Sequence, residues 1–294
     1  MTFPLHVASV DSLFVSIDGG ARQARNSMQL DPLFGPTNWN YYESGHTKYF
    51  AFDFPFCPVL LISGDISSSQ PGKRDRLFSI KSRKLDLDAY LKTQIIITLW
   101  DLRDAIVKFA ILDGWAHGIN LFLSGLTISN KVYTCVTLIV ESAGSSAPSK
   151  WEAKYDTKKN QWLMWTFPPS TKSERWSPDH SLMSTFLAHG SSEINWNSYA
   201  GEYIDDLRNY KNYIETYWNV VSGGNIPGFE EGLNFNVALQ SAAIAFSRSG
   251  EKLGVPDQFR PVNFPITVFS INSRAKSLKR VSAKEVPQLL RKYM

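Results

Sequence analysis

Cysteine is scarce in this sequence, because only Cys57 and Cys135 occur among its 294 residues. Two cysteines cannot build a disulfide-rich scaffold or a four-cysteine zinc site. Both stand among apolar neighbours, which predicts that they are small buried side chains. The chain is long enough to fold around a sizeable hydrophobic core instead.

Long apolar runs are also missing. The longest, such as residues 95–100, are far shorter than the roughly 20 residues that span a bilayer. We therefore expect no membrane insertion. The first residues show no basic start followed by an apolar run, which a secretory signal would have. These observations predict a soluble, cytoplasmic protein.

The short motifs that identify a chemistry are absent as well. No G-x-G-x-x-G, Walker A, G-x-S-x-G or H-E-x-x-H pattern occurs. Each of these motifs places backbone amides, a nucleophile or metal ligands where a reaction needs them. Their absence argues against P-loop nucleotide hydrolases and zincins, and it makes a Rossmann-type enzyme less expected. Nothing in the sequence predicts a cofactor or a metal site.

Apolar and aromatic residues are present in good supply. Hydrophobic residues make up 43% and charged residues 20%, which is typical of a globular chain. Runs that alternate or are rich in β-branched residues, separated by Gly, Pro and Asp, predict strands. These runs are 13–17, 48–54, 59–63, 93–100 and 131–141, with a hairpin over 151–155 and 161–167. Between them, residues 101–112 fit either a helix that begins at Asp101 or a strand over 106–112.

The second half of the chain has a helical period. Apolar residues three and four apart predict a helix over about 198–222, and a second one follows over about 229–249. A late strand over 266–271 and a short basic helix over 286–293 complete the prediction. The fold class is therefore α+β, with a β-rich body of antiparallel, sandwich-like sheet (1–190), an αα-hairpin (191–259), and a late strand with a basic tail (260–294). If the late strand returns to the sheet of the body, all three parts form one domain.

The net charge of +4 is unevenly distributed. From residue 260 onward there are eight basic residues and one acidic residue, so the rest of the chain is net negative. Two clusters of cations predict contacts with an anionic partner. One cluster consists of Lys73, Arg74, Arg76, Lys81, Arg83 and Lys84, and the other of Arg274, Lys276, Lys279 and Arg280. Solvated surface is the alternative interpretation of both.

Two Asp–His pairs are candidates for acid–base chemistry. Asp113 and His117 are four residues apart, so on a helix a carboxylate could orient the imidazole. Gly114 favours a turn there instead. Asp179 and His180 are adjacent in a Pro-containing segment, and adjacent side chains rarely point the same way. Both pairs are therefore weaker candidates than the charge pattern.

Four tryptophans within 26 residues offer a further surface. Flat rings beside polar groups can stack on sugars or bases, although one or two of them are expected to pack in the core. These rings are Trp151, Trp162, Trp165 and Trp176.

Two hypotheses of function follow. The favoured one is a non-catalytic binding or structural protein whose basic clusters contact nucleic acid or another polyanion. Phosphate contacts by Lys and Arg need no fixed motif, which fits the missing motifs. The alternative is a hydrolase or carbohydrate-active enzyme with an aromatic-lined cleft and an Asp–His pair.

Overall fold

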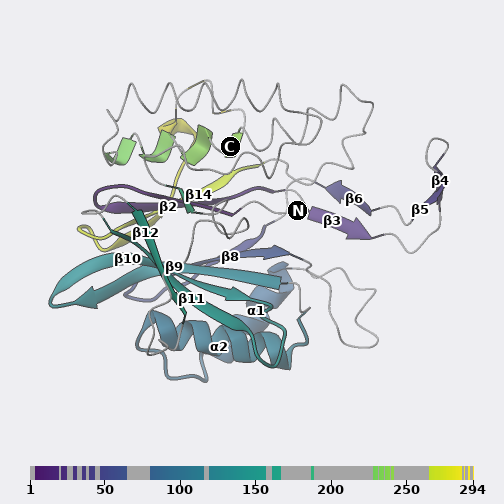
Figure 1. Cartoon of the computed structure of the whole chain (residues 1–294), viewed down its shortest axis with the longest axis horizontal. Helices are drawn as coiled ribbons and strands as arrows, with labels where there is room; N and C mark the ends of the chain where they lie inside the picture. The colour runs from purple at the N-terminus through teal and green to yellow at the C-terminus, as the bar shows by residue number, and fades with distance from the viewer. Residues whose placement is uncertain are drawn as a thin grey trace.

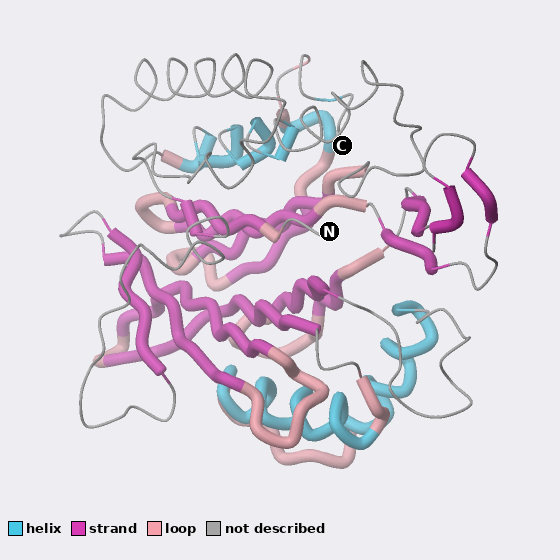
Figure 2. Tube along the Cα trace, turned by 45° about the vertical axis from the view of Figure 1, so that its right-hand side comes forward, coloured by secondary structure: helices cyan, strands magenta, loops and turns pink. Residues whose placement is uncertain are grey.

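The protein is built from two β-sheets that lie face to face between helices. The computed structural model describes residues 4–19, 21–24, 29–31, 35–37, 40–43, 47–64, 80–115, 119–156, 161–166, 187–188 and 265–286, residues 228–241 except 231, 235 and 239, and residues 288, 291 and 294. Figures 1 and 2 show the layers: helical residues, a first sheet, a second sheet, and the helices α1 and α2. The prediction of an α+β fold with a β-rich, sandwich-like body is confirmed.

The first sheet contains both early and late strands. We call it the β1 sheet, and its order is β13 (Leu187–Ala188), β1 (Leu5–Ala8), β2 (Ser12–Ile17), β14 (Thr267–Asn272) and β15 (Ser277–Arg280). All of its pairs are antiparallel except β13 with β1. The late strand predicted over 266–271 is β14, and it pairs directly with β2.

The second sheet, the β9 sheet, is antiparallel throughout. Its order is β12 (Gln161–Thr166), β11 (Ser149–Asp156), β10 (Val132–Glu141), β9 (Ile119–Ser129), β8 (Val59–Gly64) and β7 (Tyr49–Ala51). The strands expected near 59–63 and 131–141 and the predicted tryptophan hairpin are confirmed. The strand expected over 48–54 is shorter, because the chain turns at 54–57, where Cys57 has a φ of 51°.

The helix α2 (Leu99–Leu112) corrects one prediction. Residues 93–100 are not a strand, because Thr98 is the N-cap of α2. The Thr98 Oγ1 accepts a hydrogen bond from the Asp101 N–H at 3.2 Å, and the Asp101 carboxylate accepts one from the Thr98 N–H at 2.8 Å. This reciprocal capping box satisfies donors that a helix start leaves open. The segment before it is a connection in which Ile95 and Ile97 are 88% and 76% exposed.

The helix α1 (Ile80–Leu91) was not predicted. It lies beside α2 in the same outer layer, and both helices lie on the side of the β9 sheet that points away from the β1 sheet (Figures 1 and 2). Gly125 of β9 lies close to α2, because a Cβ there would come within 2.8 Å of the Leu99 side chain. Glycine therefore permits the close packing of helix on sheet.

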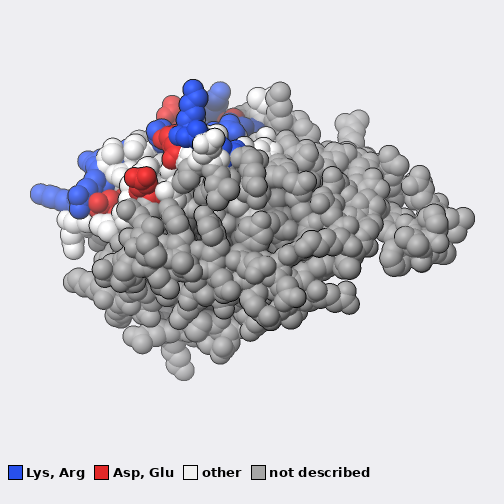
Figure 3. All heavy atoms as spheres, turned by 90° about the horizontal axis from the view of Figure 1, so that it is seen from above, with Lys and Arg blue, Asp and Glu red and all other residues white. Residues whose placement is uncertain are grey.

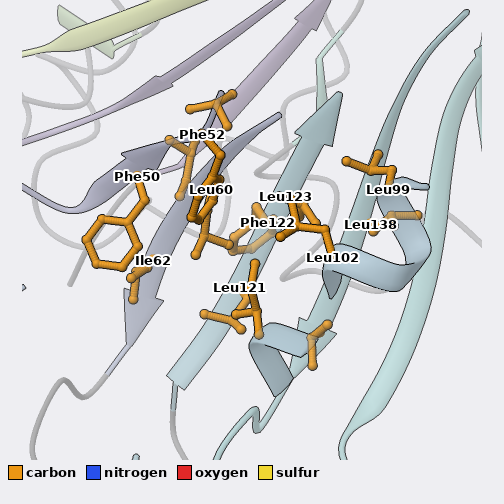
Figure 4. Close-up of a cluster of buried hydrophobic side chains, with 14 of the residues drawn as sticks. Phe50, Phe52, Leu60, Ile62, Leu99, Leu102, Leu121, Phe122, Leu123 and Leu138 are labelled. Atoms are coloured by element: carbon orange, nitrogen blue, oxygen red, sulfur yellow. The ribbon is translucent and has the colours of Figure 1, made fainter. Parts of the chain in front are cut away.

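A continuous hydrophobic core fills both faces of the β9 sheet. Figure 4 shows Leu99 and Leu102 of α2 among side chains of β8, β9 and β10. On the other face, the ring of Phe122 lies 5.6 Å from that of His6, and Tyr49 lies 5.0 Å from Phe269 in an edge-to-face arrangement. These ring contacts join the two sheets. The central strands are therefore buried on both sides.

The outer face of the β1 sheet is covered by helix. The described residues between 229 and 241 are helical, in agreement with the second predicted helix. The Phe229 ring packs edge-to-face on Phe14 at 5.1 Å, and a Cβ on Gly232 would come within 2.8 Å of that same Phe14 ring. The first predicted helix, over 198–222, lies outside the described residues.

Smaller elements complete the described chain. The pairs β3 (Ala21–Ala24) with β6 (Asn40–Glu43) and β4 (Gln29–Asp31) with β5 (Gly35–Thr37) form separate two-stranded sheets, and a 3-10 turn covers Ala283–Glu285. The helix predicted over 286–293 falls mainly outside the described residues. None of the described helices has the length and the apolar composition that a membrane-spanning segment requires.

Candidate functional site

The hairpin of β14 and β15 gathers the four cations predicted near the end of the chain. Arg274 and Lys276 lie in its turn, and Lys279 and Arg280 lie on β15, the edge strand of the β1 sheet. All four side chains are exposed. The four cations grouped by charge counting therefore share one exposed hairpin, which we call the basic hairpin (Arg274, Lys276, Lys279 and Arg280).

Two cations of the basic hairpin lie over aromatic rings of the β9 sheet. The Lys276 Nζ is 4.3 Å from the centre of the Tyr133 ring, and the Arg280 guanidinium carbon is 5.6 Å from the centre of the Tyr49 ring. A ring attracts a cation through its quadrupole but does not neutralise its charge. Both charges therefore remain available to an anion while their side chains are held in place.

The other two cations are paired with carboxylates. The Arg274 Nε is 2.8 Å from Asp11 Oδ1, and the Lys279 ammonium contacts the Glu285 carboxylate. That ammonium and the Ser282 N–H hold the pKa of Glu285 below its usual range. Among the described residues seen from above, Figure 3 shows atoms of basic and acidic side chains next to one another. The positive charge at Arg274 and Lys279 is thus partly balanced.

The turn of the basic hairpin is fixed by contacts with two other turns. The Ser273 N–H donates to the Asp11 carbonyl at 2.8 Å, and the Cys57 thiol donates to the Lys276 carbonyl at 3.3 Å. Burial raises the pKa of the Cys57 thiol, so it stays protonated and able to donate. Both cysteines are free and only partly buried. The hairpin is therefore held in place before any partner arrives.

The geometry of this surface is the only guide to its role. The sequence matches no protein-family model, and no curated protein matches it. Within the part of the chain that the structure describes, no group of three or more His, Cys, Asp or Glu residues could hold a metal ion. What the hairpin offers is positive charge beside aromatic and apolar side chains.

The other basic cluster is only partly described. Lys73, Arg74 and Arg76 lie outside the described residues, and so does the side chain of Lys81. The two remaining members, on α1, are ion-paired: Arg83 with Asp113 at 2.6 Å and Lys84 with Asp88 at 2.6 Å. These pairs brace the helical layer, so the two described cations of this cluster are already balanced by carboxylates.

Asp113 uses both carboxylate oxygens in contacts at the C-terminal end of α2. Its Oδ1 accepts from Arg83, and its Oδ2 accepts from the indole Nε1 of the fully buried Trp115 at 2.9 Å. The residue ends α2, in the turn that Gly114 favours, rather than standing on a helix with His117. His117, Asp179 and His180 lie outside the described residues, so the two Asp–His pairs remain predictions.

The predicted tryptophan hairpin is present as β11 and β12, and the structure describes the side chains of β11. Trp151 is partly buried on β11 and packs against the core, opposite Ile139. In the register of β11 with β12, Trp162 pairs with Tyr155 and Trp165 with Glu152. Trp176 lies outside the described residues. Sequence reasoning did not find that Trp100 of α2 donates from its indole nitrogen to Glu152 at 3.2 Å.

Sequence analysis did not predict the buried ion pair between Lys48 and Asp18. The Lys48 Nζ is 3.1 Å from Asp18 Oδ2, and the two side chains are 2% and 0% exposed. Asp18 follows β2 and Lys48 precedes β7, so the pair bridges the two sheets. Burial lowers the pKa of Lys48, and the neighbouring Asp18 charge opposes that effect. Thirty residues separate the two in the chain, and no motif connects them.

Proposed function

We propose that this chain is a cytoplasmic binding protein for nucleic acid and that the basic hairpin is its contact surface. One observation carries the proposal: Lys276 and Arg280 are exposed, are held over tyrosine rings, and have no described carboxylate within ion-pair distance. Exposed cations without a carboxylate partner can replace their hydrating water molecules by phosphate oxygens.

The arrangement favours a polymer over a single small anion. The two cations lie on one edge strand and its turn, with the paired Arg274 and Lys279 close to them in the chain. Surface ion pairs contribute roughly 0–1 kcal/mol, so a phosphate can compete with Asp11 and Glu285 for their cations. Binding to a phosphate backbone releases counterions, and its strength depends on the number of phosphates neutralised.

The experiment is a salt titration of binding to labelled oligonucleotides, followed by fluorescence anisotropy. The double variant Lys276→Gln with Arg280→Gln keeps a polar, unbranched side chain at both positions and removes both charges. Because each phosphate contact contributes about 0.7–0.9 to the slope of log K against log salt, we expect the slope to fall by about 1.4–1.8.

The matched control is Arg274→Gln with Lys279→Gln, which removes two charges from the same hairpin. Since both of these cations are already paired with carboxylates, we expect a smaller change in slope. An absence of binding at low salt, or an unchanged slope in the Lys276/Arg280 variant, refutes the proposal.

A second candidate function rests on the Lys48–Asp18 pair. Lysines with lowered pKa values cluster at functional sites, where the neutral amine can act as a general base. The pair lies between the two sheets, and the Lys48 carbonyl accepts from the Ile62 N–H at 2.9 Å, so its backbone is fixed as well. Because both side chains are buried, the candidate is a hydrolase in which a movement of the chain exposes Lys48 to a substrate, Lys48 then transfers a proton, and Asp18 holds it in position.

Loss of activity in a single variant would not test that candidate, because one unpaired buried charge destabilises a fold by roughly 3–5 kcal/mol. The variant is therefore Lys48→Met with Asp18→Leu, which replaces both charges by apolar groups and is expected to fold. Turnover would be screened on fluorogenic esters, peptides and glycosides. Activity in the parent that disappears in a folded double variant supports the candidate, and equal activity in both excludes it.

A further inference from the structure

We infer that the partner of the basic hairpin is single-stranded nucleic acid, whose unpaired bases pack on exposed apolar side chains beside the cations. This inference rests on the proposed function and adds the class of nucleic acid. The surface in question is the tip surface, made of Val10, Ile128, Tyr133, Arg274 and Lys276.

Exposed aliphatic side chains flank the turn of the basic hairpin. Val10 is 52% exposed and Ile128 is 60% exposed. Ile128 lies directly opposite Tyr133 in the pairing of β9 with β10, and Tyr133 carries Lys276 over its ring. On the other side, Val10 precedes Asp11, which binds both the Arg274 side chain and the Ser273 N–H. Each cation of the turn is therefore next to an apolar group.

The turns that carry these side chains are rigid. At the tip of the β9–β10 hairpin, Asn130 and Lys131 have φ values of 51° and 66°. Positive φ at both central residues is typical of the tight two-residue turn that matches strand twist. Because hydrogen bonds also tie the β1–β2 turn to Ser273, little ordering is left to occur on binding.

This combination of groups matches a single strand better than a duplex. Cations bind phosphates in either form. In a duplex the flat faces of the bases are stacked inside, so exposed apolar groups gain little. In a single strand the bases can turn out and pack against aromatic and apolar side chains. The tip surface offers both kinds of contact, from the turn of the basic hairpin and from the β1–β2 and β9–β10 hairpins that contact it.

The test separates charge from apolar contact by the same salt titration, carried out with a single strand and with a duplex of the same sequence. The variant is Val10→Ser with Ile128→Ser. We expect about tenfold weaker binding of the single strand at every salt concentration, with an unchanged slope, because apolar contacts release no counterions. We expect almost no change for the duplex.

The matched control is Ile95→Ser with Ile97→Ser, which alters two still more exposed aliphatic side chains on the α1–α2 connection. This control should bind like the parent. Equal affinity of the parent for single strand and duplex overturns the inference, and so does an equal loss in both serine variants. If either result occurs but the slope of log K against log salt still falls in the Lys276/Arg280 variant, the proposed function stands and only the inference fails. If the parent binds no nucleic acid at all, both fail.

Discussion

Lys48 is the residue whose surroundings differ most from what its type prefers. A lysine that is 2% exposed loses nearly all hydration of its ammonium group, and the hydrogen-bonded Asp18 carboxylate offsets part of that loss. That imbalance lowers the pKa of Lys48. Arg280 and Lys276 show the opposite situation, because both side chains are exposed and each lies over an aromatic ring.

The lowered pKa of Lys48 gives a stability that depends on pH. Between that lowered pKa and the ordinary lysine pKa of about 10.4, the unfolded chain binds a proton at Lys48 that the folded chain has released. The free energy of unfolding should therefore rise with pH across this window, by up to about 1.4 kcal/mol per pH unit. Below the window both states are protonated, and the contribution of Lys48 is constant.

Urea denaturation at a series of pH values checks this expectation. The control is the variant with Lys48→Met and Asp18→Leu, which retains every other titrating group. Subtracting its profile leaves the contribution of the pair. If the two profiles run parallel through pH 10, then the pKa of Lys48 is not lowered in the folded protein.

The elements that were predicted correctly have a recognisable pattern within their own residues. β10 is a run rich in β-branched residues, the β11–β12 hairpin alternates, and turn residues bound both, so the local pattern was enough. α1 was missed because its buried side chains form a narrow stripe. Leu87 is fully buried, whereas Leu85, two residues away, is 68% exposed. That spacing does not produce the broad apolar face from which a helix is recognised.

The mistaken strand over 93–100 shows how one capping interaction overrides propensity. Three consecutive isoleucines at 95–97 favour a strand, but the reciprocal hydrogen bonds of Thr98 and Asp101 begin a helix directly after them. The side-chain hydrogen bond of Thr98 also lowers the pKa of Asp101. A Thr-x-x-Asp pattern before an apolar run could have indicated the helix start.

Replacing Thr98 tests the importance of that cap. Thr98→Ala removes the acceptor for the Asp101 N–H, and we expect the protein to lose about 1 kcal/mol of stability. Thr93→Ala is the control, because Thr93 is an exposed threonine in the same connection whose hydroxyl donates to the Tyr90 carbonyl and accepts from the Gln94 side chain, but caps no helix start. Urea midpoints measure both. Equal midpoints for the two variants would show that the capping box contributes nothing.

At the scale of the whole molecule, the chain end returns to the centre of the first sheet. β14 lies between β2 and β15, so residues near 15 and near 270 are neighbours. The sequence indicated a late strand but not its partner, because pairing over such a distance leaves no local pattern. The site shows the same limit. Charge counting grouped the four cations, but their partners lie in distant segments of the chain. Asp11 pairs with one of the cations, whereas Tyr49 and Tyr133 lie under two others and leave their charges unbalanced.

This topology means that removing the chain end is a change to the fold, not only to the charge. A chain that stops after Asn272 lacks β15 and the buried Val281 and Val286, which are 5% and 2% exposed. It also leaves β14 as an open edge, since the Val281 N–H donates to Val268. Burial of two valines contributes about 3–6 kcal/mol, so we expect the truncated chain to lose at least a comparable stability.

Thermal and urea unfolding of the two chains measure this, and identical midpoints would show that the hairpin is dispensable for folding. If the loss occurs, weaker nucleic-acid binding by the truncated chain follows from unfolding alone, and only the side-chain variants of the basic hairpin can assign the contact.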